Sequence, residues 1–342
     1  MKNRYPRLRQ FCLAATLVFS IAIATAAQGT WVMENRSYHD PLRAEPRAAQ
    51  ISITAIAISD ELPFVQEPGK RPVWDISLGK EIPIVGYETG DGKGKPLGKG
   101  KWGIGFWLPV SFHMIEDFKD PSSPILNTDY RFGGAVKAQY GLTKHSRLGG
   151  RIQVGHESTH LGDEFSLAAR RTKPDFERVN VSYEYWEYNV SFETDQGKQR
   201  LHRLVFRHGG IGLINSKKGF YSPESLEPDG RTIARSARNF EPYLGFEWLL
   251  QRGLFMGLGP FASVDVRFRT IYDYQKASDL EREDSQPSIN LLLGLRFKAD
   301  RKPEDKGIPE LFFRYYHGVN PAGQFRNQKN YQLIGFGIYV PI

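Results

Sequence analysis

A histidine and a serine two positions apart, His156 and Ser158, are the residues of this sequence whose types and spacing best suit catalysis. Side chains two positions apart in a β-strand lie on the same face, so the pair can meet if this stretch is a strand. A serine hydroxyl becomes a nucleophile when a neighbouring base takes its proton, and imidazole is the usual base. The spacing therefore predicts an activated serine, with Ser158 as nucleophile and His156 as general base and then acid.

A third group should orient the imidazole, and carboxylates follow the pair closely. Glu164 lies in the loop predicted after this strand, and Glu177 opens the next strand, so either can serve as the orienting group. Asp163 and Glu164 can instead help to hold a hard cation such as calcium, whose oxygen ligands often come from loops. Two carboxylates alone fall short of a calcium site.

The residues around the pair alternate between two kinds of side chain, as those of a half-exposed strand do. The face of the pair is apolar and the opposite face is charged: the first holds Leu148, Ile152 and Val154, and the second holds Arg147, Arg151 and Glu157. In a water-soluble sheet the apolar face would be a core, whereas in a membrane barrel it would point at lipid. The class of the protein therefore decides what surrounds the pair.

Residues 1–27 have the features of a secretory signal peptide: a basic start, an apolar run over Phe11–Ala24, and small residues for cleavage. We expect this segment to be removed, together with Cys12, the one cysteine of the chain. The mature protein would then have no thiol for a disulfide or a zinc site. Four of the 46 Lys and Arg lie in this segment, so the net charge falls from +8 to about +4, which is too small to predict nucleic-acid binding.

The mature sequence combines export, 13% aromatic residues and persistent alternation, without the run of apolar residues that a membrane helix needs. This combination is typical of an antiparallel transmembrane β-barrel in the outer membrane of a Gram-negative bacterium. Residues 28–46 lack periodicity and predict a periplasmic lead-in, which assigns the barrel to residues 47–342. We expect about twelve strands, near residues 47–59, 72–87, 101–113, 127–141, 147–160, 177–193, 200–215, 238–250, 254–274, 285–298, 309–318 and 329–340.

Connections between these strands alternate between short and long, as in barrels with short periplasmic turns and long outer loops. In this register the strand of His156 and Ser158 runs outward, so the pair would lie at the level of the outer leaflet. Basic residues of the predicted outer loops, such as Arg170 and Arg171, could pair with the phosphates of lipopolysaccharide. The aromatic-rich last strand resembles the insertion signal of outer-membrane proteins, which implies the barrel-insertion machinery as a partner.

His156-Glu157-Ser158 resembles the outward-facing His-x-Ser motif of two outer-membrane enzymes, the outer-membrane phospholipase and the lipid A 3-O-deacylase. The resemblance implies hydrolysis of an ester of an outer-leaflet lipid, either a phospholipid or lipid A. Dimerisation gates the phospholipase, so a homodimer is an open alternative here. Thr159-His160 follows the serine in this chain, whereas the phospholipase has Asn-Gly at that place.

A longer resemblance, to a bacterial outer-membrane family labelled as a domain of unknown function, implies a barrel and supplies no activity. The matching strings are Asp40-Pro41-Leu42, Glu45-Pro46-Arg47, residues 78–83 and 86–87, Trp102-Gly103-Ile104-Gly105, and residues 120–123, 126–130, 156–165 and 180–184. The alternative function is therefore a non-catalytic barrel, either a small-solute porin or a structural protein. A soluble β-sandwich is a third interpretation, since its strands also alternate.

Overall fold

The computed structural model describes residues 30–32, 38–59, 71–89, 97–118, 123–172, 181–195, 202–213, 240–270, 285–297, 307–325 and 328–341. The expected signal peptide, residues 1–27, lies outside these ranges. Among the helices described, none is long and apolar enough to cross a membrane.

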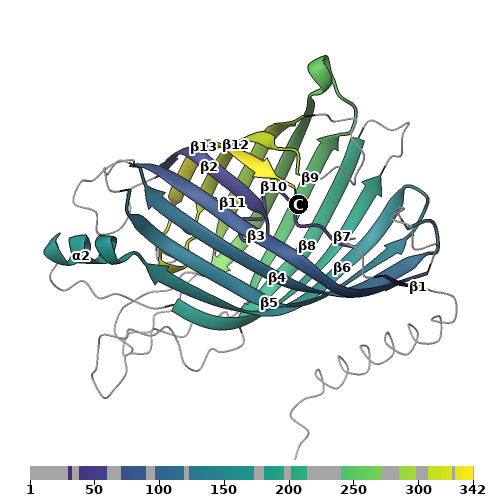
Figure 1. The fold of residues 1–342 in the computed structure, drawn as a ribbon, viewed down its shortest axis with the longest axis horizontal. Coiled ribbons are helices and arrows are strands. Elements are labelled where there is room, and N and C mark those ends of the chain that lie inside the picture. Colours follow the sequence, from purple (N-terminus) through teal and green to yellow (C-terminus); the bar gives the residue numbers. More distant parts are fainter. Residues whose placement is uncertain are drawn as a thin grey trace, which may run out of the picture.

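Twelve antiparallel strands, β2 to β13, form a closed barrel, because β2 pairs with both β13 and β3 and the remaining strands pair in chain order. They are β2 (Ile51–Ser59), β3 (Arg71–Glu88), β4 (Trp102–Asp117), β5 (Ile125–Gly141), β6 (Ser146–Leu161), β7 (Val181–Asp195), β8 (His202–Leu213), β9 (Phe240–Leu250), β10 (Gly259–Thr270), β11 (Ser285–Arg296), β12 (Glu310–Gly318) and β13 (Tyr331–Val340). The predicted barrel of about twelve strands is confirmed. Figure 1 shows β3 to β7 as the long strands of the wall.

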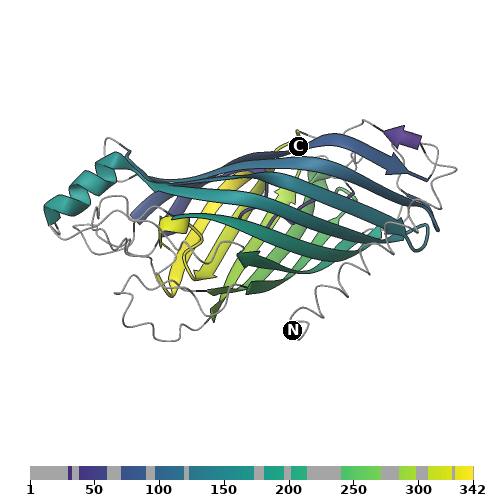
Figure 2. The same ribbon diagram turned by 90° about the horizontal axis from the view of Figure 1, so that it is seen from below.

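The barrel has two distinct ends. A short strand, β1 (Thr30–Val32), pairs with the last residues of β3 at one end. A helix, α2 (Asp163–Thr172), follows β6 at the other end. Figures 1 and 2 show these two elements at opposite ends of the barrel, which we call the β1 end and the α2 end.

The alternation of the sequence puts charged side chains inside the barrel and apolar side chains outside. On β10, Asp265 and Arg267 face the lumen and are 2% and 4% exposed, whereas Phe268 faces outward and is 42% exposed. The same order holds on β13, where the outward Phe336 is 59% exposed. A sheet with its apolar side chains outside is stable when hydrocarbon surrounds it, because burial in lipid removes that surface from water.

Residues 38–50, which we call the lumen segment, lie inside the barrel. The sequence predicts a periplasmic lead-in over residues 28–46 and a first strand that begins near Arg47, whereas β2 begins at Ile51. Tyr38, Ala44 and Glu45 are each at most 3% exposed. The difference has a physical reason: Arg43, Glu45 and Arg47 have charged partners on the inner wall, and a charge is buried when it is paired.

A loop at the α2 end, residues 319–325 with the 3-10 helix η3 (Gly323–Phe325), folds into the mouth of the barrel. Its Ala322 and Phe325 pack in a buried apolar cluster with Val73, Ile115, Leu126, Leu161, Tyr316, Tyr331 and Leu333 from six strands. This cluster fixes the loop to the wall through apolar burial.

Two segments differ from the elements that the sequence predicts. The residues after Gly162, expected as a loop, form α2, whose first turn holds Asp163 and Glu164. Acidic side chains there are favourable because the amino end of a helix carries partial positive charge. The strand expected from Leu254 begins instead at Gly259, because a turn with the 3-10 helix η2 (Phe255–Gly257) precedes it.

Candidate active site

His156, Ser158 and His160 lie on the outward face of β6, near its α2 end, as the sequence predicts. Their inward neighbours Glu157 and Thr159 are 1% and 0% exposed, whereas the three outward side chains are half-buried. Aromatic rings of β5 cover the two imidazoles. The ring centroids of Phe132 and His156 are 5.3 Å apart, and those of Tyr130 and His160 are 5.9 Å apart.

The hydrogen bonds join these residues in a different pairing from the one predicted. Ser158 Oγ bonds to His160 Nε2 at 3.0 Å, so the serine uses the imidazole on its other side. His156 Nε2 bonds to Ser182 Oγ on β7 at 3.2 Å. The register of β6 and β7 explains the second bond, because Ser182 lies directly opposite Ser158 and therefore diagonal to His156.

The second nitrogen of His156 faces a carboxylate. Glu184 lies directly opposite His156 on β7, and its Oε1 is 3.6 Å from His156 Nδ1. The imidazole therefore lies between the hydroxyl of Ser182 and the carboxylate of Glu184. With the ring proton on Nδ1, Nε2 can accept the proton of Ser182, which is the arrangement that activates a serine nucleophile.

Of the two predicted third residues, Glu164 is not among the polar contacts of His156. Glu164 and Asp163 are exposed on the first turn of α2, and the polar contacts of His156 go to Ser182 and Glu184. Glu177 lies outside the described residues. Within the described ranges there is also no group of three or more His, Cys, Asp or Glu side chains that could hold a metal ion. The calcium interpretation of Asp163 and Glu164 stays a prediction.

Ser182 and Glu184 are the site residues that the sequence analysis missed. They have the same two-residue spacing as the histidine and serine of β6, and strict alternation puts both on the outward face of β7. That signal was present in the sequence. The register that sets Glu184 opposite His156 was not, because a shift of two residues would keep every side chain on its face and change every partner.

The described part of the inner wall is a separate chemical environment. On the same strand as His156 and Ser158, the side chains of Arg151, Gln153 and Glu157 point into the lumen, where all three are buried. The candidate site and the lumen charges therefore lie on opposite faces of one sheet, and a substitution in one need not disturb the other.

The model of the family described as "Protein of unknown function (DUF1207)" matches residues 6–340. The chain belongs to this family. A search of curated proteins finds no match to the DUF1207 chain.

Solved bacterial outer-membrane barrels are similar to the DUF1207 chain. Outer membrane phospholipase A from Escherichia coli has 10% sequence identity and a TM-score of 0.45, over 89% of this chain and 94% of that chain. The translocator domain of the autotransporter NalP from Neisseria meningitidis has 9% identity and a TM-score of 0.38, over 97% and 95%. The outer membrane protein OprD from Pseudomonas aeruginosa has 8% identity and a TM-score of 0.31, over 89% and 96%.

Proposed function

We propose that this DUF1207 barrel hydrolyses an ester of an outer-leaflet lipid, with Ser182 as the nucleophile, His156 as the general base and Glu184 as the orienting group. One observation carries the proposal: the two ring nitrogens of His156 face the hydroxyl of Ser182 and the carboxylate of Glu184. Ser158 is the weaker nucleophile because its imidazole, His160, contacts Ser158 and the ring of Tyr130, and no carboxylate of the described residues pairs with it.

In the proposed reaction, Ser182 Oγ attacks the carbonyl carbon of the lipid ester while His156 Nε2 takes the hydroxyl proton. The carbonyl oxygen becomes an oxyanion, which needs a hydrogen-bond donor. Ser158 is opposite Ser182 across the strand pair, and we assign its hydroxyl to this role. His156 then gives its proton to the leaving alcohol, and a water molecule, activated by the same imidazole, hydrolyses the acyl-serine.

The surroundings of the site suit a lipid substrate. On the same outward face, Phe132 lies opposite His156, while Ile152 and Val154 lie toward the β1 end from the site; the three are 56%, 57% and 55% exposed. Such a surface is apolar where it meets hydrocarbon, so acyl chains can lie along it while the ester stands at the level of His156. The proposal places the barrel in the outer membrane of a Gram-negative bacterium, where the insertion machinery and lipopolysaccharide are its expected partners.

A non-catalytic structural barrel is the second candidate, and the lumen segment favours it over a porin. The segment fills the middle of the barrel and is held by ion pairs to the wall. The cavity beside it measures about 10 Å³, which is space for about one water molecule. In this state, the part of the lumen that the structure describes is packed with side chains.

A fluorophosphonate ester probe tests the proposal directly, because it phosphonylates serines that a neighbouring base activates. The purified, folded barrel is treated in mixed lipid micelles, digested and analysed by peptide mass spectrometry. We expect the adduct on Ser182, and we expect its loss in His156→Ala. Ser146→Ala is the matched control, since Ser146 begins the same strand at the far end. An adduct on Ser158 would show that Ser158, and not Ser182, is the nucleophile. The absence of an adduct on every serine would contradict the hydrolase proposal.

A further inference from the structure

The lumen segment carries three charges at every second position, and each meets the opposite charge on the wall. Arg43 binds Glu247 and Glu310, at 2.8 and 2.6 Å. The other two positions repeat the pattern with the sign alternating: Glu45 binds Arg151, Arg207 and Arg267 at 3.3, 3.0 and 3.7 Å, and Arg47 binds Asp129 at 2.7 Å as well as Glu157. Charge complementarity in three successive layers therefore holds the segment in place.

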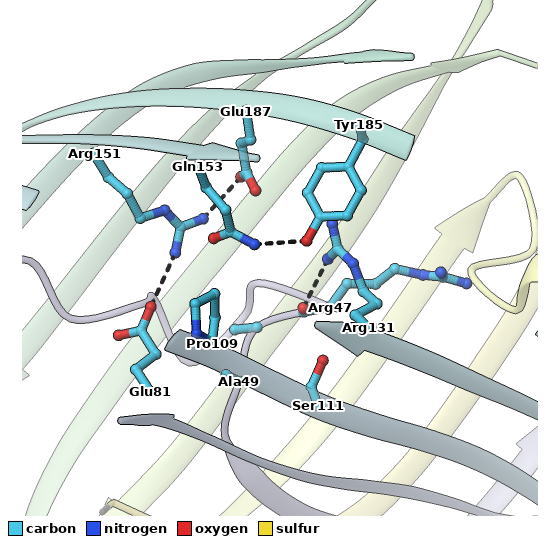
Figure 3. Close-up of a pocket in the computed structure, with 11 residues that line it drawn as sticks. Arg47, Ala49, Glu81, Pro109, Ser111, Arg131, Arg151, Gln153, Tyr185 and Glu187 are labelled. Atoms are coloured by element: carbon cyan, nitrogen blue, oxygen red, sulfur yellow. Dashed lines mark hydrogen bonds and ion pairs between the residues drawn. The ribbon is translucent and has the colours of Figure 1, made fainter. Parts of the chain in front are cut away.

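Most of these wall residues also have a partner on the wall itself. The wall pairs are Glu310 with Arg296 at 3.2 Å, Glu157 with Arg131 at 3.1 Å, Arg267 with Asp265 at 2.6 Å, and Arg151 with Glu187 at 3.0 Å. Figure 3 shows Arg151 between Glu187 and Glu81, and the lumen segment passing beside Arg131. If the segment left, these four pairs would remain and Asp129 would lose Arg47, so most of the penalty for emptying a charged lumen is avoided.

Arg207 and Glu247 differ, because all their hydrogen bonds and ion pairs with described residues go to the lumen segment. Arg207 binds Glu45, His39 and the carbonyl of Asp40, and Glu247 binds the main chain and side chain of Arg43. Glu247 is opposite Val205 in the β8–β9 register, so Arg207 lies at its diagonal position on the same inner face. Long side chains at diagonal positions can meet. With the segment out, Arg207 and Glu247 can therefore pair with each other.

The barrel thus has two alternative sets of ion pairs, one with the segment inside and one with the wall closed on itself. A switch between conformations requires two packed arrangements in which the charged groups are paired about equally well. The lumen segment also reaches the closure at the α2 end, since Arg47 Nε donates to the carbonyl of Pro321 at 2.9 Å. Asp129 links the lumen segment to loop 319–325, because it binds Arg47 and accepts a hydrogen bond from the main-chain N–H of Gly323.

We propose that residues 38–50 are a displaceable plug and that this barrel is a gated conduit for small polar solutes. Withdrawal of the plug toward the β1 end exposes a lumen whose wall carries paired acids and bases. Release of Arg47 also removes its hydrogen bonds to Pro321 in loop 319–325, which Asp129, Ser288 and Arg269 continue to hold. The proposal stands on the lumen and does not depend on the hydrolase site.

Single-channel recording in planar lipid bilayers tests the plug with one substitution and one lock. Glu45→Arg sets a cation against Arg151, Arg207 and Arg267 and should expel the segment. The lock is a disulfide added to Glu45→Arg by Ala44→Cys and Ser263→Cys. These two residues are neighbours, since Ala44 N donates to Ser263 Oγ at 3.1 Å. Arg203→Ala is the matched control, since the ion pair that it breaks joins Arg203 to Glu193 on the wall.

We expect the wild type and Arg203→Ala to stay closed, and Glu45→Arg to raise the frequency of open channels at least tenfold. The locked variant should be silent when oxidised and conduct after reduction, which separates plug release from misfolding. A second variant, Glu45→Arg with Phe325→Ala, also loosens the loop at the mouth. If folded barrels of both Glu45→Arg variants remain silent, or if oxidation of the lock leaves their current unchanged, the plug proposal is wrong.

Discussion

The cluster of Arg47, Glu157, Asp129 and Arg131 gives a stability prediction whose size follows from charge balance. Two cations and two acids are buried together, and the side chains of Arg47 and Glu157 are 7% and 1% exposed. Arg47→Met leaves two acids with one cation, and Glu157→Gln leaves two cations with one acid. Each change leaves one buried charge uncompensated, so each should lower the free energy of unfolding by about 3 kcal/mol.

The double variant restores the balance, since Arg131 and Asp129 remain. Its cost should be about 3 kcal/mol instead of the additive 6, which is a coupling energy of about 3 kcal/mol. Arg203 and Glu193 are the comparison pair: their side chains are 27% and 14% exposed, and their coupling should stay below about 1 kcal/mol. Urea unfolding of the barrel in lipid vesicles, followed by tryptophan fluorescence, measures the wild type and the six variants. Additive losses at Arg47 and Glu157 would refute the reasoning.

Three further predictions concern the site and the mouth. Glu184→Gln should lower kcat/KM about tenfold and less than His156→Ala, because Glu184 is half exposed and 3.6 Å from the ring; equal losses would contradict this. Ser158→Ala should lower kcat about 100-fold with KM unchanged if its hydroxyl binds the oxyanion, and a change confined to KM would exclude that role. Gly323→Val should expel loop 319–325, because an added Cβ would lie 2.2 Å from Thr159 Cγ2; limited proteolysis should then cut this loop faster, and an unchanged rate would contradict the packing.

The strands of this barrel were predictable because alternation is a local property. Phe336 outside and Arg267 inside follow from parity alone, and each strand repeats the same signal. The start of the first strand was not predictable in this way. An arginine such as Arg47 is equally compatible with the charged inner face of a strand. Only its partners Asp129 and Glu157, far along the chain, show that it lies in the lumen.

The candidate site was likewise predictable only in part. The outward position of His156 and Ser158 follows from their spacing, and so does that of Ser182. Which hydroxyl meets which imidazole depends on register and on side-chain rotamers, neither of which a single strand encodes. Glu184 could be found only by pairing β6 with β7, because its value as an orienting group comes from its position opposite His156.

The hydrolase account is tested most directly by mass spectrometry of lipids from outer membranes that carry the wild type, Ser182→Ala or His156→Ala at matched levels of folded barrel. Ser146→Ala serves as the control. The account predicts lyso-phospholipid or deacylated lipid A with the wild type and the control, and neither product with the two site variants. Identical lipid profiles in all four membranes would contradict it and leave the structural barrel as the better description.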